Sequence, residues 1–410
     1  MSNVSSSNSQ AVRVPKLRFP GFEGEWKEKT FSDLASGFEY GLNAAACDFD
    51  GKNRYIRITD IDEESHQYHG ESPVSPQGIL EAKYIVGEND ILFARTGAST
   101  GKTYLYRKSD GLLYFAGFLI RATINERNDS NFVFNLTLTS KYNRWVKLTS
   151  MRSGQPGINS QEYASYRAYV PSLEEQQKIS SFLSAIDKRI EKQRQLVEAL
   201  KSYKRGVSTA LFTRKLRLSK SYSSHNTEWS KKYLGDIFSE RTERAAGSER
   251  LLAVTINNGV QDRTELDLKD NSSDDKRNYR VVHIGDLAYN TMRMWQGACG
   301  VSAFDGIVSP AYTVLYVTDN TDNFTPFWGY YFKDTPMLQT FQRNSQGLTS
   351  DTWNLKYEKF ARISVYAPPF QEQVQIAGFL DCISDKIAAN EDYLNTLVKY
   401  KRGLLSLLFI

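Results

Sequence analysis

The sequence predicts an α+β protein with two pseudo-symmetric globular domains, joined by two long helices that form an antiparallel coiled coil. The tetrapeptide Tyr-Lys-Arg-Gly stands at 203–206 and again at 400–403, 197 residues later in a chain of 410 residues. Each copy lies in a segment whose apolar residues recur in alternating steps of three and four. A repeat at about half the chain length indicates an internal duplication, and strand-like runs separated by turns fill the rest of each copy.

The duplication divides the chain at matching points. The first twelve residues lack the basic start and apolar core of a signal peptide, so we expect a disordered tail there. Three scattered cysteines form no disulfide or zinc pattern and favour a cytoplasmic location. The predicted segments are a tail (1–12), a first globule (13–170), a central helix (171–215), a linker (216–228), a second globule (229–367) and a C-terminal helix (368–410).

A shift of 197 residues aligns the starts of the two helical segments. PSLEEQQKISSFLSAI at 171–186 lies over PPFQEQVQIAGFLDCI at 368–383, with isoleucines and leucines in register. Upstream, GEW at 24–26 matches TEW at 227–229 at a shift of 203, so the first copy is about six residues longer. Prolines before both segments suit the entry points of helices.

Both helical segments carry a seam that repeats every 3.5 residues over four heptads, which predicts a coiled coil. A residue with a side-chain amide takes the fifth seam position in each. The pseudo-two-fold relation makes the helices antiparallel, and forty residues of helix extend about 60 Å, so we expect the globules at opposite ends of a rod. The seams are Ile179, Leu183, Ile186, Ile190, Gln193, Val197, Leu200, Lys204, Val207 and Leu211, and Ile376, Leu380, Ile383, Ile387, Asn390, Leu394, Leu397, Lys401, Leu404 and Leu408.

Charge is unevenly distributed along the chain. Residues 171–217 hold eleven basic and five acidic residues, a net charge of +6, whereas 368–410 has a net charge of −1. This difference favours pairing of the two helices with each other. The basic segment is typical of contact with nucleic acid or an acidic partner, although a solvated helix face explains it equally well.

The two globules share a frame but differ in their loops. Strands are predicted at 54–61, 90–96, 102–107 and 118–125, and at 250–257, 282–291 and 310–317, with helices at 141–152 and 325–343. The divergent loops are 90–102 against 286–300, and 151–163 against 343–360. Their polar tips suit hydrogen bonds to base edges and phosphates, and ordinary polar turns are the alternative explanation.

Two short motifs resemble catalytic ones without meeting their requirements. TGASTGKT at 96–103 has Thr96 in place of the first glycine of a phosphate-binding loop, and a strand-like run follows it. APPFQEQ at 367–373 resembles an amino-methyltransferase motif, but Ala367 cannot accept a hydrogen bond from a base. His66 and His69 have no third metal ligand nearby. We therefore expect no catalytic residues, no metal and no cofactor on this chain.

The order variable domain, conserved helix, variable domain, conserved helix resembles the specificity subunits of type I restriction–modification systems. LRFPGFEGEW at 17–26, PSLEEQQKI at 171–179, SYKRGVSTALF at 202–212 and MRMWQG at 292–297 carry the resemblance. It implies two target recognition domains, each reading one half of a split, asymmetric DNA site, with helices that set the gap. It also implies two methylation subunits, which hold S-adenosylmethionine and modify adenine, and motor–nuclease subunits, which use ATP and Mg²⁺.

Candidate residues follow from the loops and the repeat. We expect base contacts from Arg95, Thr96, Gln155 and Asn159, and from Arg293, Trp295, Gln296, Gln346 and Thr349; phosphate contacts from Arg57, Lys102, Arg152 and Arg343; and partner docking from Tyr203, Lys204, Arg205, Tyr400, Lys401 and Arg402. The apolar end LLSLLFI at 404–410 predicts a buried interface. A coiled-coil scaffold without DNA readout, and a self-contained DNA nuclease, are the alternative functions.

Overall fold

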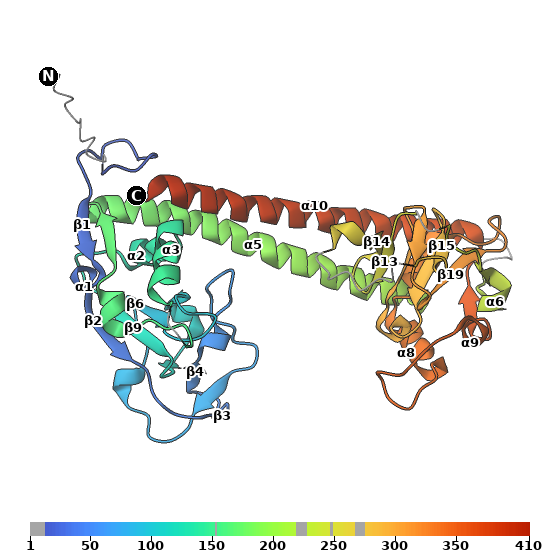
Figure 1. Ribbon diagram of the computed structural model, residues 1–410, viewed down its shortest axis with the longest axis horizontal. Helices are drawn as coiled ribbons and strands as arrows, with labels where there is room; N and C mark the ends of the chain where they lie inside the picture. The colour runs from blue at the N-terminus through green and yellow to red at the C-terminus, as the bar shows by residue number, and fades with distance from the viewer. Residues whose placement is uncertain (1–12, 152–153, 219–227, 247–248, 267–274) are drawn as a thin grey trace. The chain divides into compact units, whose positions relative to one another are not determined.

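The computed structural model (Figure 1) describes residues 13–151, 154–218, 228–246, 249–266 and 275–410. The predicted tail and most of the predicted linker, residues 219–227, lie outside these residues. The chain forms two compact units, which we call unit 1 (Met1–Gln193 with Tyr393–Ile410) and unit 2 (Arg194–Asp392). Each unit therefore contains one globule and parts of both long helices.

Unit 1 is built on a four-stranded antiparallel sheet in the order β2-β9-β6-β7 (Ala35–Tyr40, Leu119–Ile124, Asp90–Ala94 and Thr103–Leu105). β1 (Lys27–Thr30) pairs with β10 (Arg167–Val170) and brings the two ends of the globule together. Smaller pairs join β3 (Ala46–Asp48) to β5 (Val74–Pro76) and β4 (Arg54–Ile56) to β8 (Leu113–Phe115). The helices are α1 (Phe31–Leu34), α2 (Ser130–Leu136), α3 (Ser140–Thr149) and α4 (Ser160–Ala164).

Unit 2 repeats this frame. Its four-stranded sheet has the order β12-β19-β16-β17 (Phe238–Glu240, Tyr312–Val317, Leu287–Asn290 and Cys299–Val301), and β11 (Ser230–Tyr233) pairs with β20 (Ser364–Ala367). Two further pairs are β13–β14 (Leu252–Thr255 and Gly259–Asp262) and β15–β18 (Arg280–Val282 and Gly306–Val308). The helices are α6 (Leu234–Ile237), α7 (Thr325–Tyr331), α8 (Thr335–Asn344) and α9 (Tyr357–Phe360). The common strand order confirms the predicted pseudo-symmetric pair of α+β globules.

The two long helices are α5 (Leu173–Phe212) and α10 (Phe370–Leu408). In unit 1 the first half of α5 contacts the end of α10, where Lys401 Nζ lies 2.6 Å from Asp187 Oδ1. In unit 2 the second half of α5 contacts the start of α10, where Lys204 Nζ donates to Ser384 Oγ at 2.6 Å. Every residue of both predicted seams is buried or half-buried. The antiparallel coiled coil is thus confirmed within each unit.

A buried glutamine fixes each long helix to its globule. Gln176 accepts a hydrogen bond from Asp129 N at 2.9 Å and donates to Pro171 O at 3.1 Å. Gln373, the residue at the matching position, accepts from Phe324 N at 2.8 Å and donates to Pro368 O at 2.9 Å. A buried amide without partners costs about 1–3 kcal/mol, so the repeated glutamine explains part of the sequence similarity between the two helix starts.

The apolar end of the chain is buried within unit 1. Leu404, Leu408 and Phe409 join a core that contains Trp26 and Phe132, and the Phe409 ring lies 5.0 Å from that of Phe132. The buried interface predicted for residues 404–410 is therefore an internal one.

Candidate nucleic-acid interface

Strand order brings three distant segments of unit 1 to one edge of the sheet. β9 is antiparallel to both β2 and β6, with Tyr40 opposite Ile120 and Ala94 opposite Leu119. The end of β2, the start of β9 and the end of β6 therefore meet at this edge. Side chains that are far apart in the sequence converge there.

The two divergent loops of unit 1 are hydrogen-bonded to each other beside this edge. Gly97 N donates to Pro156 O at 3.0 Å, and Ile158 N donates to Arg95 O at 2.9 Å. Gly97 has a φ of 80°, which favours glycine. Because the backbones are tied together, residues from both loops are presented as one surface.

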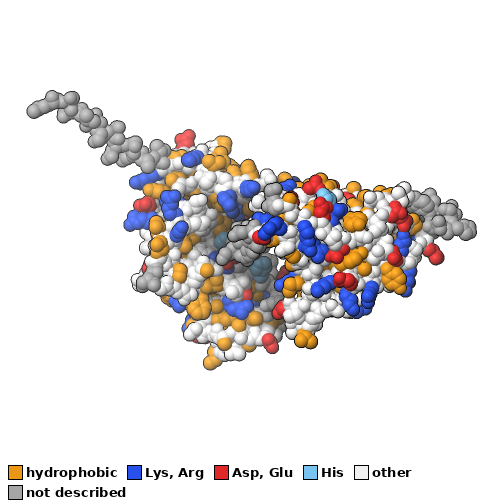
Figure 2. Space-filling model, turned by 45° about the vertical axis from the view of Figure 1, so that its right-hand side comes forward, with side chains coloured by type: hydrophobic (Ala, Val, Ile, Leu, Met, Phe, Trp, Pro, Cys, Tyr) orange, Lys and Arg blue, Asp and Glu red, His pale blue; other side chains and the backbone are white. Residues whose placement is uncertain are grey.

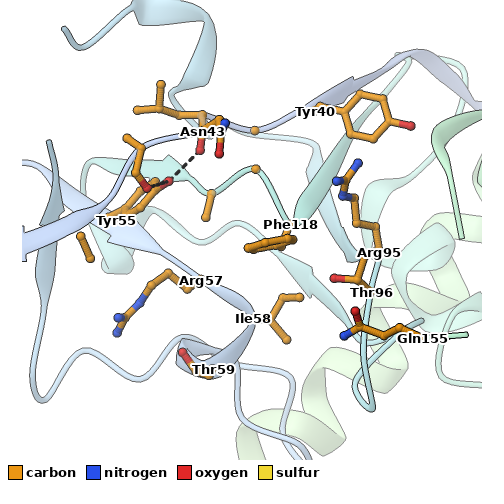
Figure 3. A pocket seen from close by; sticks show the side chains of 16 residues that line it. Tyr40, Asn43, Tyr55, Arg57, Ile58, Thr59, Arg95, Thr96, Phe118 and Gln155 are labelled. Atoms are coloured by element: carbon orange, nitrogen blue, oxygen red, sulfur yellow. Dashed lines mark hydrogen bonds between the residues drawn. The ribbon is translucent and has the colours of Figure 1, made fainter. Parts of the chain in front are cut away.

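A cavity of about 720 Å³ lies against these loops. Four residues predicted to contact DNA line it, namely Arg57, Arg95, Thr96 and Gln155. Figure 3 shows Arg95 and Thr96 next to Gln155, with Arg57 on the other side of Phe118. The fold thus brings into one cavity residues that the sequence offers in three separate segments.

Two aromatic rings hold the Arg95 guanidinium. Its central carbon lies 5.0 Å from the Tyr40 ring centre and 5.9 Å from that of Phe118. Its Nε is buried and has no hydrogen-bond partner. The rings restrict the side chain, and a guanidinium held in this way suits bidentate recognition.

Sequence reasoning missed the aromatic part of this cavity. Phe118 is 60% exposed and Tyr40 is 42% exposed, although both are large apolar residues. Hydrogen bonds from Ser160 lower the pKa of Tyr40. Tyr55 donates its hydroxyl proton to Leu42 O at 2.6 Å and holds the adjoining wall. The sequence signal for this aromatic part is Phe118 in the short turn AGF, since an aromatic residue is unusual in an exposed turn.

Two of the predicted DNA-contact residues have local structural roles. Arg57 forms two hydrogen bonds of 2.8 Å to the Asp60 carboxylate. Asn159 caps the start of α4, where its side-chain oxygen accepts from Glu162 N at 2.9 Å. Arg57 lines the cavity, so its pairing positions it there, whereas the Asn159 oxygen is engaged with the helix. The predicted phosphate contact Arg152 lies outside the described residues.

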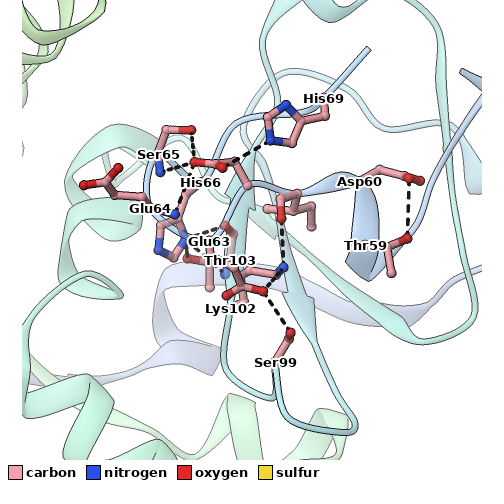
Figure 4. Close-up of polar contacts among 12 residues, drawn as sticks. Thr59, Asp60, Glu63, Glu64, Ser65, His66, His69, Ser99, Lys102 and Thr103 are labelled. Atoms are coloured by element: carbon pink, nitrogen blue, oxygen red, sulfur yellow. Dashed lines mark hydrogen bonds and ion pairs between the residues drawn. The ribbon is translucent and has the colours of Figure 1, made fainter. Parts of the chain in front are cut away.

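Lys102 is placed unfavourably for the predicted phosphate contact. Its side chain is 5% exposed, and Nζ donates to Ile61 O at 2.8 Å and to Glu63 Oε1 at 2.7 Å. Figure 4 shows this amine enclosed by the segment that contains Glu63 and His66. The lysine of the sequence TGASTGKT therefore fixes one loop to another, and we leave it out of the proposed interface.

The divergent loops of unit 2 also lie together. Leu355 N donates to Thr291 O at 2.9 Å, and the ring of Trp295 lies edge-on to that of Trp353 at 5.1 Å. The loop with Thr291 follows β16, which occupies the place of β6 in the strand order. Unit 2 thus presents its paired loops at the same position on the frame as unit 1.

The predicted contact residues of unit 2 occupy both loops and the adjacent helix end. Arg293 donates to Gln296 Oε1 at 3.2 Å, and the Trp295 indole donates to Met292 O at 3.1 Å. The remaining predicted residues are exposed on the second loop or at the end of α8, namely Arg343, Gln346 and Thr349. All six side chains are exposed or half-buried.

Basic residues of the central helix are exposed, among them Lys178, Lys188, Arg189, Lys192 and Arg205. On the face drawn in Figure 2, basic and acidic side chains are interspersed and apolar atoms lie between them. This face therefore carries a mixture of charges rather than one broad positive patch.

The repeated Tyr-Lys-Arg-Gly separates into inward and outward residues. Lys204 and Lys401 take part in contacts between the helices, as described above. Tyr203 and Tyr400 are 55% and 56% exposed. The matching arginines, Arg205 and Arg402, are also exposed. The repeat therefore places the same outward-facing pair of side chains on both helices.

Among the described residues, no group of three or more His, Cys, Asp or Glu side chains is arranged to hold a metal ion. No helix in the described part of the chain is long and apolar enough to cross a membrane.

Comparison with known proteins identifies related chains. Residues 23–201 match the family model of the type I restriction modification DNA specificity domain. The type I restriction enzyme MjaVIII specificity subunit of Methanocaldococcus jannaschii is 27% identical over 136 residues, which are 33% of this chain and 31% of the relative. The match thus spans about a third of the length of that relative.

Two solved structures share the fold. The S subunit of a type I restriction–modification system from M. genitalium has a TM-score of 0.57 at 16% identity, covering 97% of this chain and 99% of that one. A chain from a structure of complex assembly and conformational transition in the type I R-M system has a TM-score of 0.55 at 16% identity, covering 93% and 96%. The family model thus covers residues 23–201, and the two solved structures, at 16% identity, show that this chain shares their fold.

Proposed function

We propose that this chain is the DNA-specificity subunit of a type I restriction–modification complex. In this proposal unit 1 reads one half of a split, asymmetric duplex site and unit 2 reads the other. The two long helices define the unspecified gap between the half-sites. The chain itself carries out no chemistry.

One observation carries the proposal: each unit presents two paired loops at the matching edge of its own four-stranded sheet. These loops are the parts that differ most between the units. In unit 1 the loops are 95–102 and 154–159, and in unit 2 they are 291–297 and 345–355. Two globules with the same fold but different polar loops are the arrangement expected of two domains that recognise different DNA sequences. Polar side chains at such tips distinguish bases in the major groove.

Within unit 1, Arg95, Thr96 and Gln155 are the proposed base contacts, and Arg57 is the proposed phosphate contact. Within unit 2, the proposed phosphate contact is Arg343, and the proposed base contacts are Arg293, Trp295, Gln296, Gln346 and Thr349. Phosphate contacts position the protein on the duplex, whereas base contacts select the sequence.

The outward faces of the helices support a role in docking partners. In unit 2, α5 exposes Leu196 and Tyr203, and in unit 1, α10 exposes Tyr393, Tyr400 and Leu407, in each case one heptad apart. Large apolar side chains repeated every seven residues form a stripe that suits another helix. We propose that these two stripes dock two methylation subunits, with Arg205 and Arg402 beside them.

In this proposal the chemistry belongs to the partners. The methylation subunits hold S-adenosylmethionine and modify the N6 of adenine, and the motor–nuclease subunits use ATP and Mg²⁺. The proposed role of this chain is to bind DNA and to position those subunits on it.

A long-read methylome tests the proposal. A host without DNA methylation receives this chain together with its cognate methylation subunit, and a second strain receives the methylation subunit alone. We expect methyladenine in one gapped, two-part motif in the first strain and none in the second. Absence of a new motif, with the complex shown to assemble, would favour a scaffold that does not read DNA. Cleavage or methylation of DNA by the purified chain alone would instead support a self-contained enzyme.

A further inference from the structure

Unit 2 contains a second cavity, of about 580 Å³, away from the loops proposed to read DNA. The second half of α5, the end of α7, the start of α10 and the turn between β13 and β14 enclose it. Gly300 lies in its floor, where an added Cβ would come within 2.7 Å of Gly259 Cα. Glycine thus permits the close approach of β17 to that turn.

Two lysines face this cavity without an acidic partner. Lys204 Nζ donates to Ser384 Oγ at 2.6 Å, and Lys333 Nζ donates to Ile256 O at 3.1 Å. Among the described residues neither lysine forms an ion pair. Burial lowers the pKa of both amines, the charge of Lys333 lowers the pKa of Lys204 further, and the charge of Asp381 offsets part of this shift. Two partly buried cations that share one cavity are unfavourable unless an anion compensates them.

The carboxylates that line the cavity are already hydrogen-bonded elsewhere. Asp334 Oδ1 accepts from the Thr209 hydroxyl at 2.7 Å, and Asp381 Oδ1 accepts from the Tyr330 hydroxyl at 2.6 Å. Burial raises the pKa of Asp334, which weakens it further as a counter-ion. The lining also includes the exposed Arg205, so basic residues outnumber acidic ones.

The corresponding place in unit 1 shows how the same frame neutralises its lysine. Lys401, which matches Lys204, forms an ion pair of 2.6 Å with Asp187. Asp187 matches Ser384 under the shift of 197 residues. The residue before the cap of the next helix is Leu138 in unit 1 and Lys333 in unit 2. Unit 2 therefore has one lysine more and lacks the carboxylate that pairs with the matching lysine in unit 1.

We propose that the unit 2 cavity is an anion site for a phosphate-type oxyanion, either free or carried by a small molecule such as a nucleoside monophosphate. The anion lies between the Lys204 and Lys333 amines and takes the place that the Asp187 carboxylate fills in unit 1. The hydroxyls of Ser208 and Thr335 line the same cavity and supply further donors. This site is independent of the proposed reading of DNA.

Calorimetric titration of the full-length chain with inorganic phosphate tests the site, with sodium chloride at matched ionic strength as the control for general salt effects. Adenosine monophosphate is titrated in parallel. We expect saturable phosphate binding, and an unfolding midpoint that rises by roughly 2–5 °C at saturation. Tighter binding of adenosine monophosphate than of phosphate would identify a nucleotide-type ligand, and equal affinity a free oxyanion.

A charge exchange between the units makes the test specific. Ser384→Asp places the unit 1 carboxylate beside Lys204, and we expect phosphate binding to weaken by about tenfold or more. Ser384→Asn is the matched variant of similar size without charge, and it should weaken binding clearly less than Ser384→Asp does, because only the aspartate also neutralises Lys204. Lys333→Met should also weaken binding about tenfold, while Lys141→Met, on the surface of unit 1, should not.

The inference is overturned if the wild-type chain shows no saturable binding beyond the chloride control. It is equally overturned if phosphate binds the wild type, Ser384→Asp and Lys333→Met with equal affinity, because the ion would then occupy another place. Circular dichroism of each variant establishes that it is folded before binding is compared.

Discussion

Substitution of Arg95 offers the most direct test of base reading in unit 1. The Tyr40 and Phe118 rings hold the guanidinium at 5.0 and 5.9 Å, so the side chain is largely positioned before DNA arrives. Of the four bases, guanine presents two acceptors in the major groove that match a guanidinium. We therefore predict that Arg95 reads a guanine in the half-site of unit 1.

The structure sets the size of the expected effect. A bidentate arginine–guanine pair contributes about 1–3 kcal/mol of discrimination, or roughly 5- to 150-fold. Arg95→Lys keeps the positive charge but cannot form the same pair, so it should lose most of this preference. Each ring adds about 0.5–1 kcal/mol to the placement of the guanidinium. Tyr40→Ala should accordingly reduce the preference by about twofold to fivefold, whereas Tyr40→Phe, which keeps the ring, should not.

The assay is the methylome of cells that contain the assembled complex, supported by competition binding with duplexes altered at one position. Arg95→Lys should relax one guanine position in one half-site and leave the other half-site unchanged. Arg167→Gln is the control, because Arg167 is an exposed arginine of the same unit that pairs with Glu28 away from the cavity. An unchanged motif in Arg95→Lys would refute the reasoning. So would an equal loss of affinity for every sequence, which indicates a phosphate contact instead.

Three further predictions follow from individual contacts. Lys102→Met should lower the free energy of unfolding by about 1–3 kcal/mol in chemical denaturation, because Ile61 O loses its buried donor; a reduced salt dependence of DNA binding would instead mean that Lys102 contacts phosphate. Burial lowers the pKa of His66, so the unfolded chain binds a proton first and stability should fall as the pH drops below about 6.5. In His66→Asn, which suits the φ of 55°, this part of the pH dependence of the unfolding midpoint should disappear. Tyr203→Glu and Tyr400→Glu should each abolish capture of one methylation subunit, measured as complex mass, while the chain stays folded; full assembly in both would contradict docking at the stripes.

The sequence predicts best the features that occur in both copies of the repeat or that follow a periodic pattern of apolar residues. The shift of 197 residues relates α5 to α10 and β10 to β20 in the structure. The seam follows from apolar spacing alone, because burial in a pair of helices selects a period of 3.5 residues. Both signals are local in sequence, and tertiary contacts do not alter them.

The predicted boundaries fail where one side chain changes the local structure. The single helix expected over 325–343 is two helices, because the backbone is extended at Asp334 and Pro336 stands in the first turn of α8. Residues 54–61 begin as β4 but continue as a 3-10 turn at Ile58–Asp60, where the Asp60 carboxylate accepts hydrogen bonds from Arg57. Such changes depend on single residues, a proline in one case and a carboxylate that binds the backbone in the other, and periodicity does not reveal them.

The candidate site could be predicted in part, for a topological reason. Arg95, Thr96 and Gln155 stand in polar loops that differ between the two copies, and this difference identifies them. Tyr40 and Phe118 stand at a strand end and in a short turn, and only the order β2-β9-β6 brings them to Arg95. Strand order is set by long-range pairing, which the sequence of a single chain does not display.

The contacts between the loops also indicate that transplanting a single loop into another chain would not transfer its DNA recognition. In unit 2 the loop after β16 and the loop after α8 hold each other through the Trp295–Trp353 ring contact and the Leu355–Thr291 hydrogen bond. A loop transplanted alone would leave one tryptophan without its partner and one backbone group without its hydrogen bond. The β11–β20 pair and Gln373, by contrast, close the globule with contacts that unit 1 repeats. The smallest piece that can change its target independently is therefore the whole globule between these contacts, because the frame is common to both units and the paired loops are not.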